Sequence, residues 1–551
     1  MTPQIEDLWN FTSLYALIFS GLVLYVLASW SLRHARSSHR LPYPPGPKPR
    51  NFITGNMGDF PKAYKPYLEY MKMGKQYGSD LIHMEALGHH YVVINSFKAA
   101  NELLEKRASI NSSRPFTLMD KLGGWENVLG LLPYADQWRI FRKLFHQNFR
   151  PNGAVKFRHI QLEKVHMFLR DLLGPYDEFM DCVVTLSESV AFSAMYGYDI
   201  TSHKEHLPRS GRQAVGVVEL GMLPGHDAFN YTPFIRYLPS WFPGCGFKKL
   251  ARDCRACIEE IKEVPFKIAM DFWKENRWSL LGELVHSDWG DEQNLTSKKV
   301  DVMKMMGATT ILASSDTTSA AIGTFILCMA LNPHVQHKAQ EEIDQILGND
   351  RLPNFEDRPS LPYIEAIYRE VLRWCPIIPL CESSLCFKLI HRQLTLIPGL
   401  PHYSTEDDVY NGYYIPKGTT LYPNIWAMTR DEQVYEKPEE FIPERHIKPD
   451  GGFEGINSIL AYGFGRRVCV GRHVADAQVW LTIACLLSVF NITKAKGPDG
   501  KEIEINVDDS YHFGGFVFPK SFPCAISPRS DAAEKMIRET SKLEYDKLYP
   551  S

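Results

Sequence analysis

The chain has 551 residues, of which 44% are hydrophobic and 23% charged, and its formal net charge is −3. This near-neutral balance does not favour a nucleic-acid partner, and the length alone would suggest two or more domains. Eleven cysteines in so long a chain do not form a disulfide framework, so we expect reduced thiols in a cytosolic environment.

The first recognisable element is an apolar run at residues 11–30, interrupted only by serine and threonine. About twenty such residues suffice to cross a membrane as a helix. Arg33, Arg36 and Arg40 follow the run and no basic residue precedes it, which predicts a lumenal N-terminus and a cytosolic body. A cleaved signal peptide is the alternative, but a basic start and a small-residue cleavage site are not clear. The sequon at Asn10 is then a candidate glycosylation site.

A proline-rich segment follows the apolar run. Leu41–Pro49 carries five prolines in nine residues, a composition that favours a stiff and extended chain. We therefore expect residues 31–50 to be a basic and proline-rich linker between the membrane segment and the folded body.

Several patterns in the body indicate secondary structure. Residues 88–96 are rich in valine, isoleucine and tyrosine, which predicts a strand, and residues 511–517 are typical of a hairpin tip. Trp138 and Arg142 are four positions apart and would share one face of a helix. From residue 153 to about residue 301 the pattern is mostly helical.

Residues 303–331 form a long apolar stretch, typical of a helix, that carries Asp316 and Thr317. An acid beside a hydroxyl in an apolar helix is costly unless it has a role or a partner. Without a role, the hydroxyls here would simply bond to the preceding turn. Further along, Glu370 and Arg373 are three positions apart, a spacing that lets both side chains meet one partner.

The sequence Tyr462–Gly471 (YGFGRRVCVG) places one cysteine, Cys469, in a glycine-rich loop behind two arginines. Positive charge and backbone N–H groups stabilise a thiolate, and glycines let the backbone approach closely. An apolar helix follows and adds its positive N-terminal end. A protein would hold a cysteine in this manner as a ligand of haem iron.

This loop resembles the haem-binding loop of the cytochrome P-450 family, whose pattern is F-x-x-G-x-R-x-C-x-G. Gly465, Arg467, Cys469 and Gly471 match, whereas Tyr462 stands where phenylalanine is usual. The resemblance covers roughly residues 40–530, and over these residues the chain resembles fungal microsomal members of the family. It implies a single large unit of the cytochrome P-450 fold, mainly α-helical with small β-sheets, instead of several domains.

The resemblance also implies the cofactor and the residues that bind it. The cofactor would be haem b, iron protoporphyrin IX, with Cys469 as the axial ligand of the iron. Residues that match haem-binding positions are Trp138, Arg142, His402 and Arg467. Trp138 and Arg142 match a W-x-x-x-R pattern in which both side chains reach a haem propionate, and arginine suits this because its guanidinium can fork onto a carboxylate.

Two further motifs acquire roles from the resemblance. Asp316 and Thr317 match an acid–alcohol pair that relays protons during oxygen activation, with Ser314 in place of a usual glycine. A buried structural network behind the haem loop is implied for Glu370, Arg373 and Arg445.

Pocket residues are placed by the resemblance alone. The family carries a loop over the substrate near residues 118–133, a lid near 224–246 and a late hairpin that reaches the pocket. The side chains expected to line it are Phe116, Leu118, Ala313, Ile378, Phe513 and Phe516. Ordinary packing is an equally good account of any one of them.

Residues 381–398 do not fit the family pattern. Their removal joins Pro379-Leu380 to Gly399-Leu400 and restores it. Cys381-Glu382-Ser383 can be encoded with a GTGAGT splice donor and Pro398-Gly399 with the CAG of an acceptor, so we interpret these eighteen residues as a translated intron. A true loop insertion is the alternative.

The sequence therefore predicts a membrane-anchored monooxygenase of the endoplasmic reticulum, with its catalytic domain in the cytosol. Electrons would come from NADPH through a separate flavoprotein reductase, because no flavin or nicotinamide motif appears in this chain. The substrate would be apolar: a terpenoid, polyketide, steroid or polycyclic aromatic compound. The alternatives are a peroxide isomerase that needs no reductase, and a haem-less product of the insert.

The expected order along the chain follows from these patterns. A lumenal N-terminus at 1–10 precedes the membrane anchor at 11–30 and the linker at 31–50. The catalytic domain then occupies 51–530, and a charged tail occupies 531–551.

Overall fold

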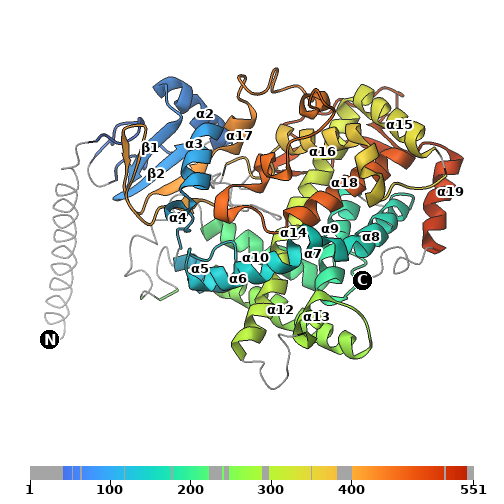
Figure 1. The fold of residues 1–551 in the computed structure, drawn as a ribbon, viewed down its shortest axis with the longest axis horizontal. Coiled ribbons are helices and arrows are strands. Elements are labelled where there is room, and N and C mark those ends of the chain that lie inside the picture. The colour runs from blue at the N-terminus through green and yellow to red at the C-terminus, as the bar shows by residue number, and fades with distance from the viewer. Residues whose placement is uncertain are drawn as a thin grey trace, which may run out of the picture.

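The structure is a computed structural model that describes residues 41–542, apart from 52–53, 62–64, 117, 175–177, 222–236, 238, 241–246, 288–296, 349, 381–399 and 514–516. The expected membrane segment at 11–30, the sequon at Asn10 and the insert at 381–398 therefore lie outside the described residues. The described body is mainly helical, with its largest sheet at one side (Figure 1).

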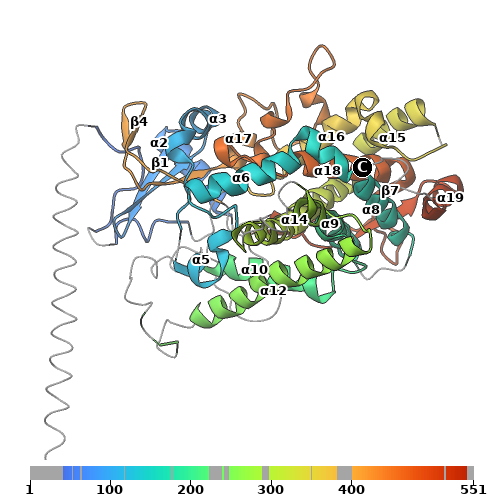
Figure 2. The same ribbon diagram turned by 60° about the horizontal axis from the view of Figure 1, so that its bottom comes forward.

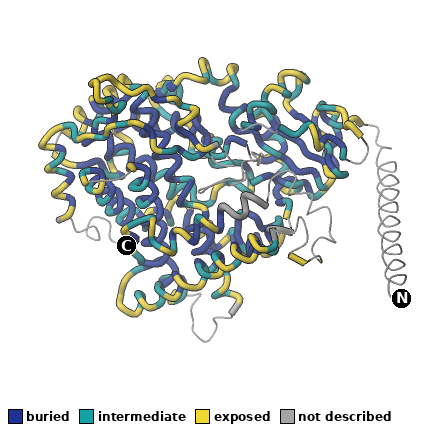
Figure 3. The backbone as a smooth tube through the Cα atoms, turned by 180° about the vertical axis from the view of Figure 1, so that it is seen from behind, coloured by how far each residue is buried: buried dark blue, intermediate teal, exposed yellow. Residues whose placement is uncertain are grey.

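One long helix, α14 (Ser297–Leu331), runs through the middle of the body. It packs against α9 (Phe179–Tyr196), α16 (Pro362–Trp374) and α18 (Arg472–Val489). Figure 3 shows that the interior of this arrangement consists of buried residues. By length and composition, α14 is the one helix in the described part of the chain that could cross a membrane, but 83% of its apolar window is buried inside the protein. It is therefore the core helix of the fold.

The other helices surround this core. The longer ones are α2 (Pro66–Tyr77), α6 (Asp136–Phe149), α8 (Arg158–Asp171), α10 (His206–Gly221), α12 (Phe247–Lys274), α13 (Leu280–His286) and α15 (Pro333–Leu347). Shorter pieces are α3 (Phe97–Ala100), the π-helix η1 (Asn101–Lys106), α4 (Ala108–Asn111), α5 (Leu118–Leu122), α7 (Pro151–Ala154) and α17 (Ile425–Thr429). Proline occupies the first turn of α2, α15 and α16, where its missing N–H is not needed. α6 lies beside α14 and α18 (Figure 2).

A four-stranded sheet lies near the N-terminal end of the described chain. Its order is β1 (Leu81–Ala86), β2 (His89–Ile94), β6 (Thr420–Pro423) and β3 (His402–Tyr403). β1 and β2 are antiparallel, β2 and β6 are parallel, and β3 is antiparallel to β6. The strand predicted at 88–96 corresponds to β2, whereas β1 was not predicted. This sheet places His402 on β3 inside the body.

Three two-stranded sheets complete the fold. β4 (Asp408–Tyr410) pairs with β5 (Tyr413–Ile415) through a turn in which Asn411 and Gly412 both have positive φ, 49° and 81°. Two consecutive residues with positive φ make the tight hairpin turn that Asn-Gly favours. β7 (Phe490–Lys494) pairs with β10 (Cys524–Pro528), and β8 (Tyr511–Phe513) pairs with β9 (Val517–Pro519). The last pair is the hairpin predicted at 511–517.

The proline-rich segment is docked on the sheet. The His83 N–H donates to the Pro45 carbonyl at 2.9 Å and the Tyr414 N–H to the Pro42 carbonyl at 2.8 Å. Tyr43 stacks on the His83 ring with a centroid distance of 4.8 Å. Backbone hydrogen bonds from β1 and β5 therefore fix the part of the linker that the structure describes.

The C-terminal segment is more ordered than a charged tail would be. α19 (Asp531–Glu539) is capped at its N-terminus by Ser530, whose hydroxyl accepts from the Ala533 N–H at 3.2 Å. Ala533 and Ile537, four positions apart, are buried where α19 packs on α18 and α8. The folded body therefore continues to at least residue 542, beyond the boundary expected at 530.

Candidate active site

The glycine-rich loop is folded by two short 3₁₀ turns, Leu460–Tyr462 and Gly465–Arg467. The Cys469 N–H donates to the Tyr462 carbonyl at 2.8 Å. Gly465 has a φ of +57°, and a Cβ at this position would lie 2.0 Å from the Leu104 carbonyl oxygen, so only glycine fits. α18 begins directly after the loop. The loop is therefore held in one shape, with Cys469 next to the N-terminal end of α18.

The environment of Cys469 combines exposure with desolvation. Its side chain is exposed, yet burial raises its pKa above that of an ordinary thiol. The Gly471 N–H and the Arg142 and Arg472 guanidiniums act in the opposite direction but do not cancel the effect of burial. The thiol is thus accessible, while the protein atoms around it disfavour the charged thiolate. Such a thiol keeps its proton until a metal ion displaces it.

Guanidinium groups from separate parts of the chain converge beside this loop. Burial, together with the charges of Arg114 and Arg142, lowers the pKa of Arg467 to about 8. Burial also lowers the pKa of Arg142 to about 10, although the neighbouring Cys469 acts against this. Among the described residues, no carboxylate forms an ion pair with Arg142 or Arg467. Like charges that are buried together are unfavourable without counter-charges, so this cluster is suited to an anionic group.

Backbone carbonyl groups fix these arginines in place. Arg467 donates to the carbonyls of Ser112 and Leu132, both at 2.6 Å. Arg142, on α6, donates to the Val468 carbonyl at 2.7 Å. The carbonyl groups orient the guanidiniums but supply no full negative charge.

Trp138 and His402 lie close to the same cluster. The Arg467 guanidinium lies over the Trp138 ring, 4.7 Å from its centroid. His402 is buried, and its Nδ1 lies 2.8 Å from the Asn111 carbonyl oxygen, which leaves Nε2 to face another group. Burial and the charges of Arg114 and Arg467 hold the pKa of His402 well below its ordinary value. An anion at this position would favour protonation of His402.

The arrangement fits a haem. A haem offers an iron that a thiolate can ligate and two propionates that need cationic partners. The structure supplies an accessible thiol at Cys469 and half-buried guanidiniums at Arg142 and Arg467 that lack carboxylate partners among the described residues. On α14, which passes through this part of the body, Ala313 is exposed although most of the helix is buried. The donor set and the surroundings therefore agree with the cofactor that the loop motif implies.

The acid–alcohol pair of α14 is divided between two environments. Asp316 is buried, and burial raises its pKa to about 6 although Arg212 lowers it. Thr317 is half-buried and its hydroxyl donates to the Ala313 carbonyl at 2.8 Å. This is the bond to the preceding turn that we gave above as the alternative to a functional role. The structure contains no hydrogen bond between Asp316 and Thr317. The two groups are adjacent in sequence but face different neighbours.

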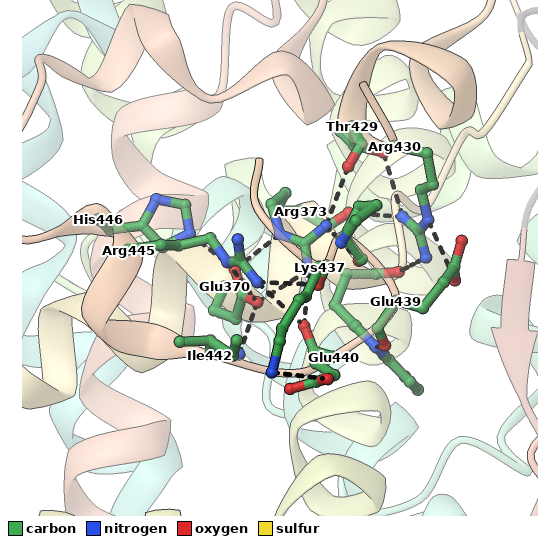
Figure 4. Close-up of polar contacts among 12 residues, drawn as sticks. Glu370, Arg373, Thr429, Arg430, Lys437, Glu439, Glu440, Ile442, Arg445 and His446 are labelled. Carbon is green, nitrogen blue, oxygen red and sulfur yellow. Dashed lines mark hydrogen bonds and ion pairs between the residues drawn. The ribbon is translucent and has the colours of Figure 1, made fainter. Parts of the chain in front are cut away.

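The predicted network behind the loop is brought together by α16 and the segment after β6 (Figure 4). Glu370 is fully buried and accepts from Arg373 Nε at 2.7 Å and Arg373 Nη2 at 2.8 Å. Arg445 Nε lies 3.3 Å from Glu370 Oε1, and His446 Nε2 lies 2.9 Å from Oε2. The Ile442 N–H donates to Oε1 at 2.9 Å. Although burial alone would raise the pKa of Glu370, the bonds from Arg373 and His446 hold it below its ordinary value.

The expected pocket residues are less well placed. Phe116 is exposed and Ile378 is half-buried, while Leu118 begins α5 and Phe513 ends β8. The side chains of Leu118 and Phe513, and the whole of Phe516, lie outside what the structure describes. The Val517 N–H donates to the Ile377 carbonyl at 2.8 Å, so the β8–β9 hairpin does lie against the chain segment that carries Ile378.

Sequence reasoning missed several residues around the site. Arg114 donates to the Leu400 and Pro401 carbonyls, both at 2.6 Å, and contributes charge next to Arg467. His446 directly follows Arg445 and could have been included in the network for that reason. Glu105 accepts from the Gly465 N–H at 2.5 Å, and no local pattern indicates it.

Comparison with known proteins agrees with this site. The family model described as "Cytochrome P450" matches residues 44–385 and 386–514, and the boundary between the two pieces falls inside the expected insert. A zebra fish cytochrome P450 solved with abiraterone is similar over 84% of this chain and 100% of that one, with a TM-score of 0.62 and 21% identity. At this identity the likeness supports the fold alone.

Fungal proteins are similar along most of the chain. Cytochrome P450 monooxygenase ple1 of Rhodocybe pseudopiperita is 35% identical over 93% of this chain and 94% of its own length. Cytochrome P450 monooxygenase 208 of Postia placenta is 35% identical over 94% and 96%. Tryptamine 4-monooxygenase of Psilocybe cyanescens is 31% identical over 95% and 99%. The chain therefore belongs to the cytochrome P-450 family and is an oxidoreductase of its monooxygenase class, which uses a thiolate-ligated haem, dioxygen and a redox partner.

Proposed function

We propose that this chain is a membrane-anchored monooxygenase in which Cys469 is the axial ligand of haem b. The observation that carries the assignment of the site is the convergence of an accessible, desolvated thiol with Arg142 and Arg467, which lack carboxylate partners among the described residues. When bound, the haem supplies the oxidation chemistry, and a thiolate ligand favours cleavage of the O–O bond.

The residues around the loop would bind and orient the cofactor. Arg142 and Arg467 offer N–H donors to the propionates, and the carbonyl groups that hold them keep those donors in place. Trp138 packs under the Arg467 guanidinium and restricts its movement. His402 would take up a proton on Nε2 beside an anionic propionate, since Nδ1 is occupied by the Asn111 carbonyl.

Asp316 and Thr317 would deliver protons during turnover. Asp316 can take up and release a proton near neutral pH, because burial raises its pKa to about 6. Thr317 can release the Ala313 carbonyl by rotation about χ1 and present its hydroxyl to the accessible side of α14. Protons would then pass from the buried side of the helix to the side on which Ala313 is exposed.

The substrate would be an apolar organic molecule bound near Ala313, Ile378 and the β8–β9 hairpin. Terpenoids, polyketides, steroids and polycyclic aromatics all suit such surroundings, in secondary metabolism or in the oxidation of foreign compounds. The name of the tryptamine 4-monooxygenase indicates that one relative acts on tryptamine, an indole that carries an alkylamine, and we propose to test this class of compound as well.

Membrane attachment and electron supply complete the proposal. The apolar run at 11–30 would span the membrane of the endoplasmic reticulum once, with Asn10 on the lumenal side as a candidate glycosylation site. The docked proline-rich segment would then hold the body in one orientation at the cytosolic face. An NADPH-dependent flavoprotein reductase would supply the electrons.

Two other interpretations of the function of this chain are possible on the same fold. A peroxide isomerase on this fold would need neither dioxygen nor a reductase, and the presence of both Asp316 and Thr317 favours the monooxygenase instead. A haem-less product is the second alternative, because the insert at 381–398 lies between Leu380, which is buried, and Leu400, whose carbonyl accepts from Arg114.

The deciding measurement is the carbon monoxide difference spectrum of the reduced protein. We would record it for the full chain, for a chain that lacks residues 381–398 and for Cys469→Ser as the control. A strongly red-shifted Soret band in both Cys469-containing proteins, absent from Cys469→Ser, is the expected result for thiolate ligation with a tolerated insert.

Other outcomes separate the alternatives. A band in the shortened chain alone would identify the insert as the cause of a haem-less product, and transcript sequencing would then test the intron interpretation. No band in either protein, with haem supplied during expression, would contradict the assignment of Cys469. A normal band without NADPH- and reductase-dependent oxygen consumption would favour the peroxide isomerase.

A further inference from the structure

A buried polar cluster lies behind Asp316, on the side of α14 that faces α9 and α10. Glu188 of α9 is 1% exposed, and it forms an ion pair with Arg212 of α10. The Ser315 hydroxyl of α14 donates to Glu188 Oε1 at 2.9 Å. Asp316, the next residue, is 4% exposed and lies within the electrostatic reach of both Glu188 and Arg212. Three helices therefore bring two buried carboxyl groups next to one half-buried guanidinium.

The charges in this cluster do not balance if both carboxyl groups are ionised. Arg212 can neutralise one carboxylate, and no described residue forms an ion pair with Asp316. Glu188 Oε2 is buried and has no hydrogen-bond partner among the described residues. An unpaired charge in such a place is costly, so the cluster is neutral when it holds one proton.

The two acids compete for one proton because both are buried beside a single guanidinium. Burial raises the pKa of Glu188 to about 7, against the effects of Arg212 and Ser315 and with a contribution from the Asp316 charge. Burial also raises the pKa of Asp316, to about 6, and the charge of Arg212 acts against this effect. Arg212 is fixed from a second side, since its Nη2 donates to the His203 carbonyl at 2.6 Å. The charged groups that act on Glu188 are thus Arg212 from α10 and Asp316 from α14, and its own helix adds none.

We propose that Glu188, Arg212 and Ser315 form a single one-proton unit with Asp316, in which Glu188 and Arg212 are positioning residues that set the charge of the relay acid. This inference rests on the proposed function, because it assigns proton delivery to Asp316. Ser315 connects the two acids, since it bonds to Glu188 and is covalently adjacent to Asp316. Removal of either positioning residue changes how many protons the cluster holds at a given pH.

The direct test is infrared difference spectroscopy of protonated carboxyl groups as a function of pH on the purified holoenzyme without turnover. At about pH 6.5, between the pKa values of the two acids, the wild-type protein should show one protonated buried carboxyl group. Glu188→Gln should lose this band, because the freed Arg212 charge then favours ionised Asp316. Arg212→Gln should gain a second protonated carboxyl group at the same pH. Glu534→Gln, at an exposed ion pair with Arg538, is the matched control and should leave the band unchanged.

A milder variant keeps the test decisive if a charge variant does not fold. Ser315→Ala removes one donor to Glu188 and should raise the pH at which the band disappears by about half to one unit. A wild-type band that survives Glu188→Gln, or a Ser315→Ala titration identical to that of the wild type, would overturn the proposal.

Failure of the proposed function would be seen separately. The solvent isotope effect on NADPH- and reductase-driven oxygen consumption should change in Asp316→Asn if Asp316 delivers protons. An unchanged isotope effect in Asp316→Asn, whatever the carboxyl band does, would refute the relay itself. A changed effect in Asp316→Asn, with the band unaffected by Glu188→Gln, would leave the relay standing and refute the one-proton unit.

Discussion

Glu370→Gln should destabilise the protein far more than its conservative chemistry suggests. The substitution keeps the shape of the side chain but removes a charge that is fully buried and accepts from two nitrogens of Arg373 at 2.7 and 2.8 Å. The new amide N–H₂ would also face donors, His446 Nε2 at 2.9 Å among them. Arg373 is itself only 4% exposed and would keep a buried charge without a counter-charge. Removal of one partner from a buried ion pair costs about 3 to 5 kcal/mol.

This free-energy cost can be converted into a change in melting temperature. With an unfolding entropy of about 2.1 cal/mol/K per residue, the melting temperature of a 551-residue chain falls by about 1 °C for each 1.2 kcal/mol of lost stability. Thermal melts followed by circular dichroism at one scan rate should therefore show Glu370→Gln lower by about 3 to 4 °C. The matched control is Glu534→Gln, whose partner Arg538 is 63% exposed, and it should move by less than about 0.5 °C. A Glu370→Gln melt within 1 °C of the control would refute the claim that this network stabilises the core.

Three further outcomes follow from the site. Gly465→Ala should lower haem content and stability, because φ is +57° and a Cβ would lie 2.0 Å from the Leu104 carbonyl oxygen; the ratio of Soret to protein absorbance measures it. Arg467→Gln should raise the melting temperature of the apoprotein, because it removes the repulsion between Arg467 and the neighbouring Arg114 and Arg142. It should lower the melting temperature of the holoprotein, because it removes a partner of a haem propionate. Thermal melts of the two forms should therefore shift in opposite directions. Folding raises the pKa of Glu188 to about 7 and that of Asp316 to about 6. The contribution of these two acids to stability is therefore complete below about pH 4 and is lost as the pH rises through 7. Between pH 5 and pH 8 the melting temperature should accordingly fall less in Glu188→Gln than in the wild type.

Local sequence patterns predicted the parts of this protein whose function depends on residues close together in the chain. The glycine-rich loop, the α14 helix and the Glu370–Arg373 spacing all satisfy this condition, and the structure contains each of them. The strand β2 was also predictable, because Tyr91, Val92, Val93 and Ile94 are aromatic or β-branched. β1 (LIHMEA) lacks that composition and becomes a strand because β2 pairs with it along its whole length.

The remainder of the site depends on tertiary contacts that no spacing encodes. Arg114 is a single arginine in a loop, and its role appears only when β3 brings Leu400 and Pro401 against it. Glu188 and Arg212 lie on different helices and become partners only through the packing of α9 and α10 on α14. α19 was taken for a tail because its surface is charged and few of its residues, such as Ala533 and Ile537, are buried against the body.

The contacts of the haem loop have a consequence for the order in which the chain matures. Arg142, Ser112 and Glu105 hold the loop across sequence separations of 326, 355 and 360 residues. Because closing such long loops is entropically costly and local helices form first, these contacts can form only after nearly the whole chain has left the ribosome. The contacts between the N-terminal third and this loop therefore cannot form until Cys469 has been synthesised. With Cys469 as the proposed haem ligand, capture of the haem is consequently a late event that joins distant parts of the chain.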